Sequence, residues 1–588
     1  MKLPLINKES VRRKSVSRFG GLDRRGSAAE DSFSELYNMD LSVYPALSTR
    51  AKRTEVNFSE TDIFGMTSLD VKVGSDIVCD AFILDTQNNL KAYYDDGDGF
   101  SGHIAMHTAS FLTQGKKQMV ASGTRLYFFP DKKVVNLVTL TDKQELGYKR
   151  VVPLGVNDNF FYELVIEKSD LDGTINTSGA FAAVSCNIYK LKNGAKGDYY
   201  DKLGYTTAIS EGDTIEISGL SKDTLNGYYN IKHIPANRRS IVISCPENLT
   251  QSTGSFVIDR SVPDMDYVVA AKNRLWGCRY GMVGGAAVNE IYACALGDAK
   301  NWHKFEGTST DSWTLSVNTP GAFTGAACLN GYPVFFKENA VIKIYGDYPA
   351  EFTAVETQQL GVEKGSGGSI AAVGDCLYYK SADGIVRYDG SVPEIVDACL
   401  GDGNFSKAIA GSLGKRYYVS MADSSGCRQL YVYDTERKLW HVENDPGIEA
   451  FCRRGNGLYM LCRSGSTCKV YGIGGDTSVG SRETGGVEWS FETGDILRET
   501  PEHKYISRIY LRLSPGSDCT FCARLSCDGE KHRTVSAHGG SGDGSVTVSL
   551  RPSRCASFRL RVQGRGSCTL HGITYEYSDA STVSPKGI

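Results

Sequence analysis

The sequence has few of the features that mark membrane proteins, secreted proteins and nucleic-acid-binding proteins. No stretch approaches the ~18 uninterrupted apolar residues of a membrane span. The first apolar patch, residues 3–6, is too short for the hydrophobic region of a secretory signal, so we expect synthesis and folding in a cytoplasm. The net charge of −3 gives no whole-chain preference for nucleic acid or anionic lipid.

Catalytic and cofactor motifs are also missing. Neither GxSxG nor HExxH occurs, and the Gly-rich runs 365–369 and 539–544 lack the Lys-Ser/Thr pair of a phosphate-binding loop. A propeller hydrolase would need several carboxylates around one axis, whereas residues such as Asp383 and Asp434 each follow a strand, where Asp caps its own turn. The sequence therefore predicts no catalytic residues, no cofactor and no enzyme.

Cysteine is present without a disulfide or metal pattern. Eight of the 17 cysteines stand singly in apolar, strand-like runs, where a free thiol packs as a small hydrophobe, so we expect no disulfides. The one close pair, Cys519 and Cys522, lacks the second CxxC or paired histidines of a zinc ribbon. Residues three apart on a strand face opposite ways, which favours packed thiols over a metal site.

What the sequence does contain is a repeat. Between about residues 264 and 475, short strands rich in Tyr alternate with Gly and Asp turns, as in 273–277, 289–293, 376–390 and 428–434. Units of ~40–50 residues built this way are typical of β-propeller blades. Similar strands between 56 and 150 predict further blades, and closure of a propeller should bring an early strand beside a late one. We expect Trp276, Trp302, Trp313 and Trp440 to be largely buried between blades.

Two further β-domains are predicted around the repeat. Residues 151–261 contain alternating strands and an Asn-Gly hairpin signal at 226–227, which predict a small β-barrel or sandwich inserted between blades. Residues 476–588 begin with a Gly/Ser/Thr-rich linker and continue with strands that have one apolar and one polar face, as in a β-sandwich. The predicted fold is all-β: a propeller from 56–150 and 262–475, an inserted β-domain and a C-terminal β-sandwich.

The first 55 residues look like a basic arm. Their excess of positive charge is consistent with a solvated tail or with a contact to nucleic acid or an acidic protein. Of these, we expect docking to a partner. The candidate docking residues are Arg12, Arg13, Lys14, Arg18, Arg24 and Arg25.

Several short phrases resemble the tail nozzle proteins of short-tailed bacteriophages, also called packaged-DNA stabilisation or tail tubular B proteins. The resemblance covers residues 15–475. The C-terminal sandwich predicted for this chain is less typical of these proteins. The phrases are Phe19-Gly20-Gly21-Leu22-Asp23, Asn38-Met39-Asp40-Leu41, Gly297-Asp298 to Asn301-Trp302, residues 333–339 with Ile344-Tyr345-Gly346, and Asp383-Gly384-Ile385 to Tyr388-Asp389-Gly390.

The resemblance implies a structural protein of the virion tail. It would form a ring, expected as a homohexamer, below the portal and head-to-tail adaptor proteins, and carry tail fibre or spike proteins. Its channel would hold packaged double-stranded DNA without sequence specificity and release it at genome ejection. The alternative is a propeller-based adhesin that binds a carbohydrate or protein receptor, which exposed aromatics on the C-terminal sandwich would favour.

Overall fold

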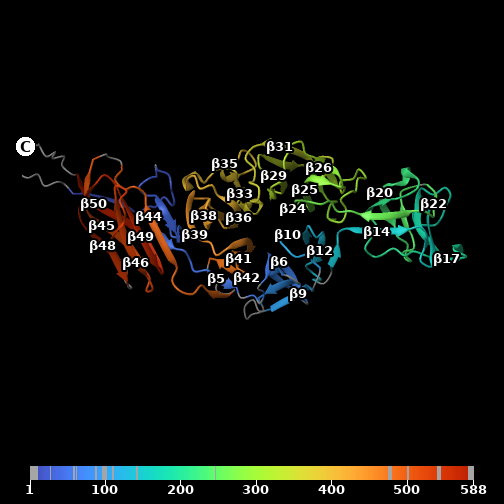
Figure 1. Ribbon diagram of the computed structural model, residues 1–588, viewed down its shortest axis with the longest axis horizontal. Helices are drawn as coiled ribbons and strands as arrows, with labels where there is room; N and C mark the ends of the chain where they lie inside the picture. The colour runs from blue at the N-terminus through green and yellow to red at the C-terminus, as the bar shows by residue number, and fades with distance from the viewer. Residues whose placement is uncertain are drawn as a thin grey trace, which may run out of the picture. The chain divides into compact units, whose positions relative to one another are not determined.

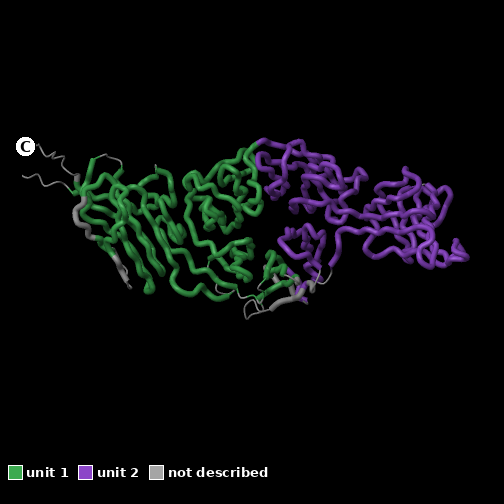
Figure 2. The backbone as a smooth tube through the Cα atoms, in the orientation of Figure 1, with its two compact units in different colours: residues 1–70, 78–105, 359–588 green, residues 71–77, 106–358 purple. Residues whose placement is uncertain are grey.

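A computed structural model describes residues 11–26, 28–56, 58, 60, 62–73, 75–86, 89–95, 102–108, 111–140, 143–245, 247–474, 480–498, 502–539 and 544–579. The described chain is built from β-strands and three single-turn 3-10 helices, so the predicted all-β class is confirmed (Figure 1). The three turns are η1 (Asp223–Leu225), η2 (Gly367–Ser369) and η3 (Ala398–Leu400). Two compact units divide the chain: residues 1–70, 78–105 and 359–588 form unit 1, and residues 71–77 and 106–358 form unit 2 (Figure 2).

The repeated element is a four-stranded antiparallel meander, as predicted for a propeller. Unit 2 holds three such sheets: β10 (Gln118–Ser122), β11 (Arg125–Phe129), β12 (Lys133–Asn136), β13 (Lys143–Glu145); β24 (Tyr267–Ala271), β25 (Arg274–Val283), β26 (Ala286–Ala293), β27 (Trp313–Ser316); and β28 (Gly325–Leu329), β29 (Tyr332–Lys337), β30 (Ala340–Tyr345), β31 (Thr353–Gln358). Two-residue turns join several hairpins, because Lys272-Asn273 and Asn330-Gly331 take the positive φ angles that suit the twist of paired strands.

Unit 1 continues the pattern. Its sheets are β32 (Ala371–Val373), β33 (Cys376–Ser381), β34 (Gly384–Tyr388), β35 (Glu394–Ile395); β36 (Ser406–Leu413), β37 (Arg416–Ala422), β38 (Arg428–Asp434), β39 (Leu439–Asn444); and β40 (Ile448–Arg454), β41 (Gly457–Ser464), β42 (Thr467–Ile473), which β5 (Thr54–Val56) and β43 (Gly480–Arg482) extend. A further meander comprises β6 (Ile63–Val73), β7 (Asp76–Thr86), β8 (Asn89–Tyr94) and β9 (Gly102–Thr108). The pairing of β5 with β42 places an early strand beside a late one, which confirms the expected mode of closure.

Aromatic side chains fill the cores of the blades. Trp276, Trp302 and Trp440 are at most 2% exposed, as predicted. Trp313 is only half-buried, because it sits at the start of β27 and packs on one side against Trp276. Trp313 is thus less buried than these three tryptophans, and its open side lines a hollow described below.

The inserted domain lies in sequence between β13 and β24 and has its own core. Its strands are β14 (Tyr148–Pro153), β15 (Gly155–Asn157), β16 (Phe160–Ser169), β17 (Phe181–Lys192), β18 (Ala195–Lys202), β19 (Thr214–Ser218), β20 (Gly227–His233), β21 (Ile241–Ile243), β22 (Leu249–Gln251) and β23 (Ser255–Arg260). Ile215 and Ile217 alternate inward from β19, as the sequence pattern predicted.

The C-terminal β-sandwich shares a sheet with a blade. One layer is the second half of a nine-stranded sheet in the order β36-β37-β38-β39-β2-β44-β49-β46-β47, and the other has the order β3-β4-β50-β45-β48 with β1 beside β50. The added strands are β1 (Arg12–Val16), β2 (Phe33–Tyr37), β3 (Met39–Asp40), β4 (Leu47–Thr49), β44 (Glu488–Thr493), β45 (Lys504–Pro515), β46 (Thr520–Cys527), β47 (Arg533–Gly539), β48 (Gly544–Cys555), β49 (Phe558–Arg565) and β50 (Cys568–Asp579).

Residues 11–56 are thus built into unit 1 rather than standing apart as an arm. β2 pairs in parallel with β39 through Tyr37 and Val442, and antiparallel with β44. Seven apolar side chains of this segment are at most 1% exposed and belong to the shared core: Phe19, Leu22, Phe33, Leu36, Met39, Leu41 and Leu47. Residues 1–10 lie outside the described residues.

Candidate functional site

The basic side chains predicted to dock a partner contact neighbours in their own chain. On β1, Arg13 pairs with Glu576 and lies 5.5 Å from the centre of the Tyr510 ring, and Lys14 Nζ is 2.6 Å from a carboxylate oxygen of Glu30. The hydrogen bond from Arg13 is the largest cause of a lowered pKa at Glu576. Arg13 therefore already serves the pairing of β1 with β50, and Lys14 binds the segment that precedes β2.

The remaining candidates spread over a wider surface. Arg18 Nε donates to the hydroxyl of Tyr44 at 2.5 Å, and the Arg24 guanidinium lies 5.8 Å from the centre of the Tyr431 ring. Arg25 forms an ion pair of 2.7 Å with Asp23. Arg12 is exposed on β1, opposite Tyr577. The structure does not gather the six residues into one patch free of carboxylates, and docking by them stays a prediction.

A buried polar cluster, which we call the latch, joins the N-terminal segment to the late blades. Arg53 Nη2 lies 3.0 Å from Glu443 Oε2, with 4% and 7% of the two side chains exposed. Arg50 donates to Glu483 at 2.9 Å and to the side-chain oxygen of Asn38 at 3.1 Å. These residues come from segments about 390 to 430 residues apart, so the latch closes a long loop of chain.

The phrase Asn38-Met39-Asp40-Leu41 now has a physical role. Asn38 takes a positive φ of 52°, which Asn tolerates better than most residues, and redirects the chain from β2 to β3. Its amide nitrogen donates to the carbonyl oxygen of Glu488 at 2.8 Å, and its side-chain oxygen accepts from the backbone N–H of Asn444 at 3.0 Å. Asp40 accepts from the backbone N–H of Ser42, which holds the following turn.

Charges within the latch determine the ionisation of Glu443. Burial by itself would raise the pKa of this carboxyl, but the side chain of His441, 3.5 Å away, and the positive charges of Arg53 and Arg50 outweigh burial and lower the pKa to about 2. Glu443 is therefore ionised throughout the physiological range, and the latch is a structural ion pair with no proton to exchange there.

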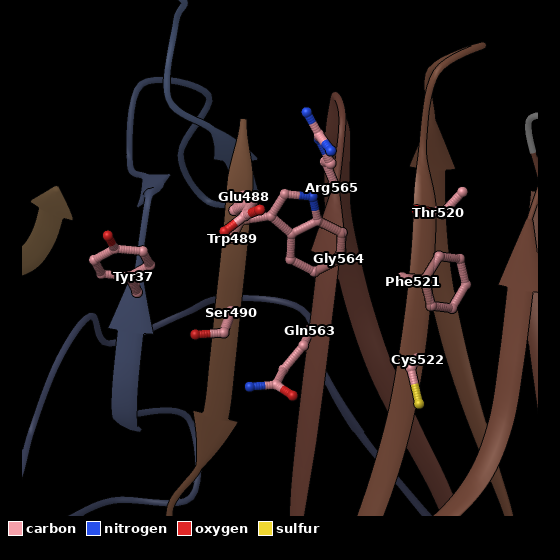
Figure 3. A pocket seen from close by; sticks show the side chains of 10 residues that line it. All are labelled: Tyr37, Glu488, Trp489, Ser490, Thr520, Phe521, Cys522, Gln563, Gly564 and Arg565. Atoms are coloured by element: carbon pink, nitrogen blue, oxygen red, sulfur yellow. The ribbon is translucent and has the colours of Figure 1, made fainter. Parts of the chain in front are cut away.

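A shallow hollow of about 490 Å³ crosses the strands of the nine-stranded sheet where β2 meets the C-terminal sandwich. Figure 3 shows its walls on β2, β44, β49 and β46. Its lining is mainly polar: Tyr37, Glu488, Trp489, Ser490, Thr520, Phe521, Cys522, Gln563, Gly564 and Arg565. With hydroxyls, an amide and both signs of charge, this groove offers hydrogen bonds to a polar partner.

The geometry of the groove depends on Gly564. A Cβ at this position would lie 2.3 Å from the Trp489 ring, so any larger residue must displace the indole (Figure 3). Trp489 is held by a hydrogen bond of 3.0 Å from its ring nitrogen to the carbonyl oxygen of Gly566, and its ring is nearly parallel to that of Phe491. The groove is therefore a fixed feature of the sheet.

Ion pairs continue along the same strands. Arg561 lies 2.8 Å from Glu35 and 3.7 Å from Glu492, and Arg559 lies 2.7 Å from Asp495. The hydrogen bond from Arg559 is the largest cause of a lowered pKa at Asp495. These pairs tie β2, β44 and β49 together beside the groove.

The CxxC pair behaves as the strand pattern predicts. Cys519 is buried and its thiol packs against that of Cys568, whereas Cys522 is half-buried at the groove. Burial is the largest cause of a raised pKa at Cys519. Within the part of the chain that the structure describes, no three His, Cys, Asp or Glu side chains gather in a way that would hold a metal ion. The same part contains no helix long and apolar enough to cross a membrane.

The fold defines a β-propeller protein with an inserted β-domain and a C-terminal β-sandwich. No family model and no curated protein matches the chain. Solved structures that match include an exo-β-1,3-galactanase from Phanerochaete chrysosporium in complex with galactose, at 12% identity over 52% of this chain and 94% of that one, with a TM-score of 0.22.

Two other matches are of the same kind. The WD40 domain of Toxoplasma gondii coronin shares 10% identity over 71% of this chain and 88% of its own, with a TM-score of 0.21. The β-propeller domain of the trilobed protease from Pyrococcus furiosus shares 9% over 56% and 96%, with a TM-score of 0.23. Likenesses this distant carry no argument about what this chain does.

Proposed function

We propose that this chain is a structural protein of a bacteriophage tail, which assembles into a ring and continues the DNA channel below the portal and adaptor. Support comes from the order of its domains and from phrases that resemble tail nozzle proteins, among them Phe19-Gly20-Gly21-Leu22-Asp23 and Asn38-Met39-Asp40-Leu41. Both phrases are buried at the junction between a blade and the C-terminal sandwich. Their burial at this junction is what we expect of phrases with a structural role.

The observation that carries the proposal is the nine-stranded sheet. It runs from the blade β36–β39 through β2 into β44, β49, β46 and β47, so a blade and the sandwich are joined by backbone hydrogen bonds. A flexible linker would allow the two to move separately, whereas a shared sheet transmits force between them. Such construction suits a tail component that must stay rigid while the genome passes.

The partners follow from this role. They are further copies of the chain in a homohexameric ring, the portal and adaptor proteins above it, tail fibre or spike proteins beside it, and packaged double-stranded DNA held without sequence specificity. The location is the virion tail. The polar groove of Figure 3 offers a surface for one of the protein partners.

The mass of the purified full-length protein tests this proposal. A homohexamer has six times the chain mass of 64.0 kDa, and negative-stain images should show rings with a central channel. Native mass spectrometry measures this directly, with dilution as the control for nonspecific association. A monomer at every concentration, with or without the purified adaptor ring, would contradict the proposal.

The alternative is an adhesin, and the structure bears on its predicted location. Among the described side chains of β44–β50, none is a large apolar residue on the surface. The exposed aromatics lie in unit 2 instead, and include Tyr199, Tyr200, Phe305 and Tyr348. Among the described residues, exposed aromatics that could bind a receptor are thus those of unit 2.

A further inference from the structure

A hollow with a mainly apolar lining lies in unit 2, beside β27 and the loop between β30 and β31. Its volume is about 670 Å³, within the range of small-ligand sites. Its lining is Phe305, Gly307, Thr308, Ser309, Asp311, Ser312, Trp313, Thr314, Tyr348, Pro349 and Ala350. Phe305 is 58% exposed and Tyr348 40% exposed. Large aromatic side chains that are exposed together at one hollow are typical of a binding site.

The wall that carries Phe305 is held rigidly. The buried carboxylate of Asp311 accepts hydrogen bonds from the backbone N–H groups of Glu306, Gly307 and Thr308, at 2.5, 2.6 and 3.1 Å. Burial would raise the pKa of Asp311, but these hydrogen bonds and that of the Thr308 hydroxyl lower it. The carboxylate is thus ionised, and the loop's own N–H and hydroxyl groups are its hydrogen-bond donors.

A second buried group supports the same loop from behind. Arg274, 1% exposed, donates to the carbonyl oxygens of Cys294, Ser309 and Asp311 at 2.7, 2.8 and 2.5 Å. The loop therefore keeps its shape without a ligand, and binding would cost little ordering entropy.

The aromatic side of the hollow is equally fixed. The ring of Trp313 packs edge-on against Trp276 and Phe352, with centroids 5.9 and 5.7 Å apart, and Trp313 itself is half-buried and lines the hollow. Trp313, Phe305 and Tyr348 together present aromatic carbon, and Thr308, Ser309 and Thr314 add hydroxyl groups to the lining.

The charge of the lining restricts the ligand. Asp311 is the one Asp, Glu, Lys, Arg or His side chain of the lining. Its carboxylate already accepts hydrogen bonds from the backbone of its own loop. Without a cation in the lining, phosphate groups and nucleic acid lack the partner they need. A neutral ligand with one apolar face and several hydroxyls matches both aromatic carbon and hydroxyl-bearing side chains.

We propose that this hollow binds a neutral saccharide, whose apolar pyranose face packs against Phe305, Trp313 and Tyr348 while its hydroxyls bond to Thr308, Ser309 and Thr314. The hollow shares no residue with the latch or the groove, and its proposed role rests on none of the observations behind the proposed function, so the two are tested independently. It gives the chain a means of holding a glycan on a surface.

The test uses the full-length protein and a panel of neutral oligosaccharides: maltotriose, cellotriose, β-1,3-galactobiose, mannotriose and chitotriose. Saturation-transfer NMR should show transfer to at least one of them, and titration of that sugar gives its Kd. Phe305→Ala and Tyr348→Ala should each weaken binding by tenfold or more, whereas Phe305→Trp should largely restore it. Tyr199→Ala, which removes an aromatic 56% exposed in the inserted domain, is the matched control and should bind normally.

Three outcomes would overturn the proposal. One is no transfer to any sugar of the panel at millimolar concentration. Another is a Phe305→Ala variant that binds as tightly as the parent. A third is a change in particle mass on Phe305→Ala, which would make the hollow a protein interface. Unchanged melting temperatures of the variants exclude unfolding as the cause.

Discussion

Arg53 and Glu443 form a buried ion pair across 390 residues of sequence, with the guanidinium nitrogen 3.0 Å from the carboxylate oxygen. Arg53 also donates to the carbonyl oxygen of Asn444 at 2.8 Å. The pair fixes the segment before β5 against the end of β39, and several testable consequences follow from burial at this point.

Breaking this pair should strongly destabilise unit 1. Glu443→Gln leaves the Arg53 charge buried without its counterion, which typically costs about 3–5 kcal/mol. Urea unfolding followed by tryptophan fluorescence measures the loss. Lys469→Ala breaks the exposed pair with Glu55, where side-chain exposure is 53% and 33%, and as a control should cost less than about 1 kcal/mol. Equal effects of the two variants would show that the latch is not a stabilising element.

The latch should also add a specific acid sensitivity. The folded-state pKa of Glu443 is about 2, below the 4.5 of a free glutamate, so the unfolded chain takes up this proton first as the pH falls. The contribution is present in full above about pH 4.5 and is lost between there and pH 2. It is on the order of 3 kcal/mol, since each pKa unit corresponds to ~1.4 kcal/mol. Unfolding free energies measured from pH 6 to pH 3 should fall more steeply for the parent than for Glu443→Gln, and parallel curves would contradict this.

The N-terminal segment should be necessary for stability. Phe19 is 1% exposed and lies 5.4 Å from the ring of Phe33, so Phe19→Ala should cost about 3–5 kcal/mol. Val43→Ala, at 48% exposure in the same segment, is the control and should change stability by less than about 0.5 kcal/mol. For the same reason, removing residues 1–25 should lower the melting temperature, contrary to what a solvated tail implies. A truncated protein that melts like the parent would restore the arm hypothesis.

Trp440 should be a central packing residue of its blade. It is 1% exposed, stacks on Tyr433 with centroids 4.7 Å apart, and donates its ring N–H to the carbonyl oxygen of Val396 at 2.9 Å. Trp440→Ala should cost about 3–5 kcal/mol, and Trp440→Phe less, because the phenyl ring keeps most of the stacking. Thermal unfolding by circular dichroism provides the measurement. An unchanged melting temperature for the alanine variant would refute this role.

The cysteines should differ sharply in reactivity. Cys427 is exposed, whereas burial raises the pKa of Cys186 to about 11 and suppresses its thiolate. A thiol reagent at pH 8 should label Cys427 first, and Cys427→Ser should remove that fast phase. In denaturant without reductant, labelling should approach all 17 thiols. A total well below this number would reveal disulfides and an oxidising compartment.

Local sequence predicted the blades because the information for a meander is local. Strands such as β28 and β29 are joined by Asn330-Gly331, and their partners lie only a few residues away. Turn residues that accept positive φ and apolar runs of strand length therefore suffice to recognise each hairpin. The same holds for Ile215 and Ile217 in the inserted domain, whose alternation alone indicates the buried face.

The N-terminal segment could not be placed in this way. β4 and β5 have three residues each, too short for a periodic signal, and their partners β50 and β42 come hundreds of residues later. The basic residues around β1 dominate the local composition, while their counterions Glu576 and Glu30 become neighbours only on folding. The composition near the N-terminus thus predicts a tail. In the structure, the same segment pairs with strands from the end of the chain and forms part of the β-sandwich.

By itself, the sequence determined the all-β class, the repeated meander, the inserted domain and the packing role of Trp276, Trp302 and Trp440, because these depend on side-chain periodicity and turn residues close in the chain. Only the tertiary structure decided that β2 joins a blade to the sandwich, that Arg53 meets Glu443, and that Phe305, Trp313 and Tyr348 line one hollow. Such contacts depend on how distant segments pack and which faces neighbouring strands leave uncovered, and no local pattern records either.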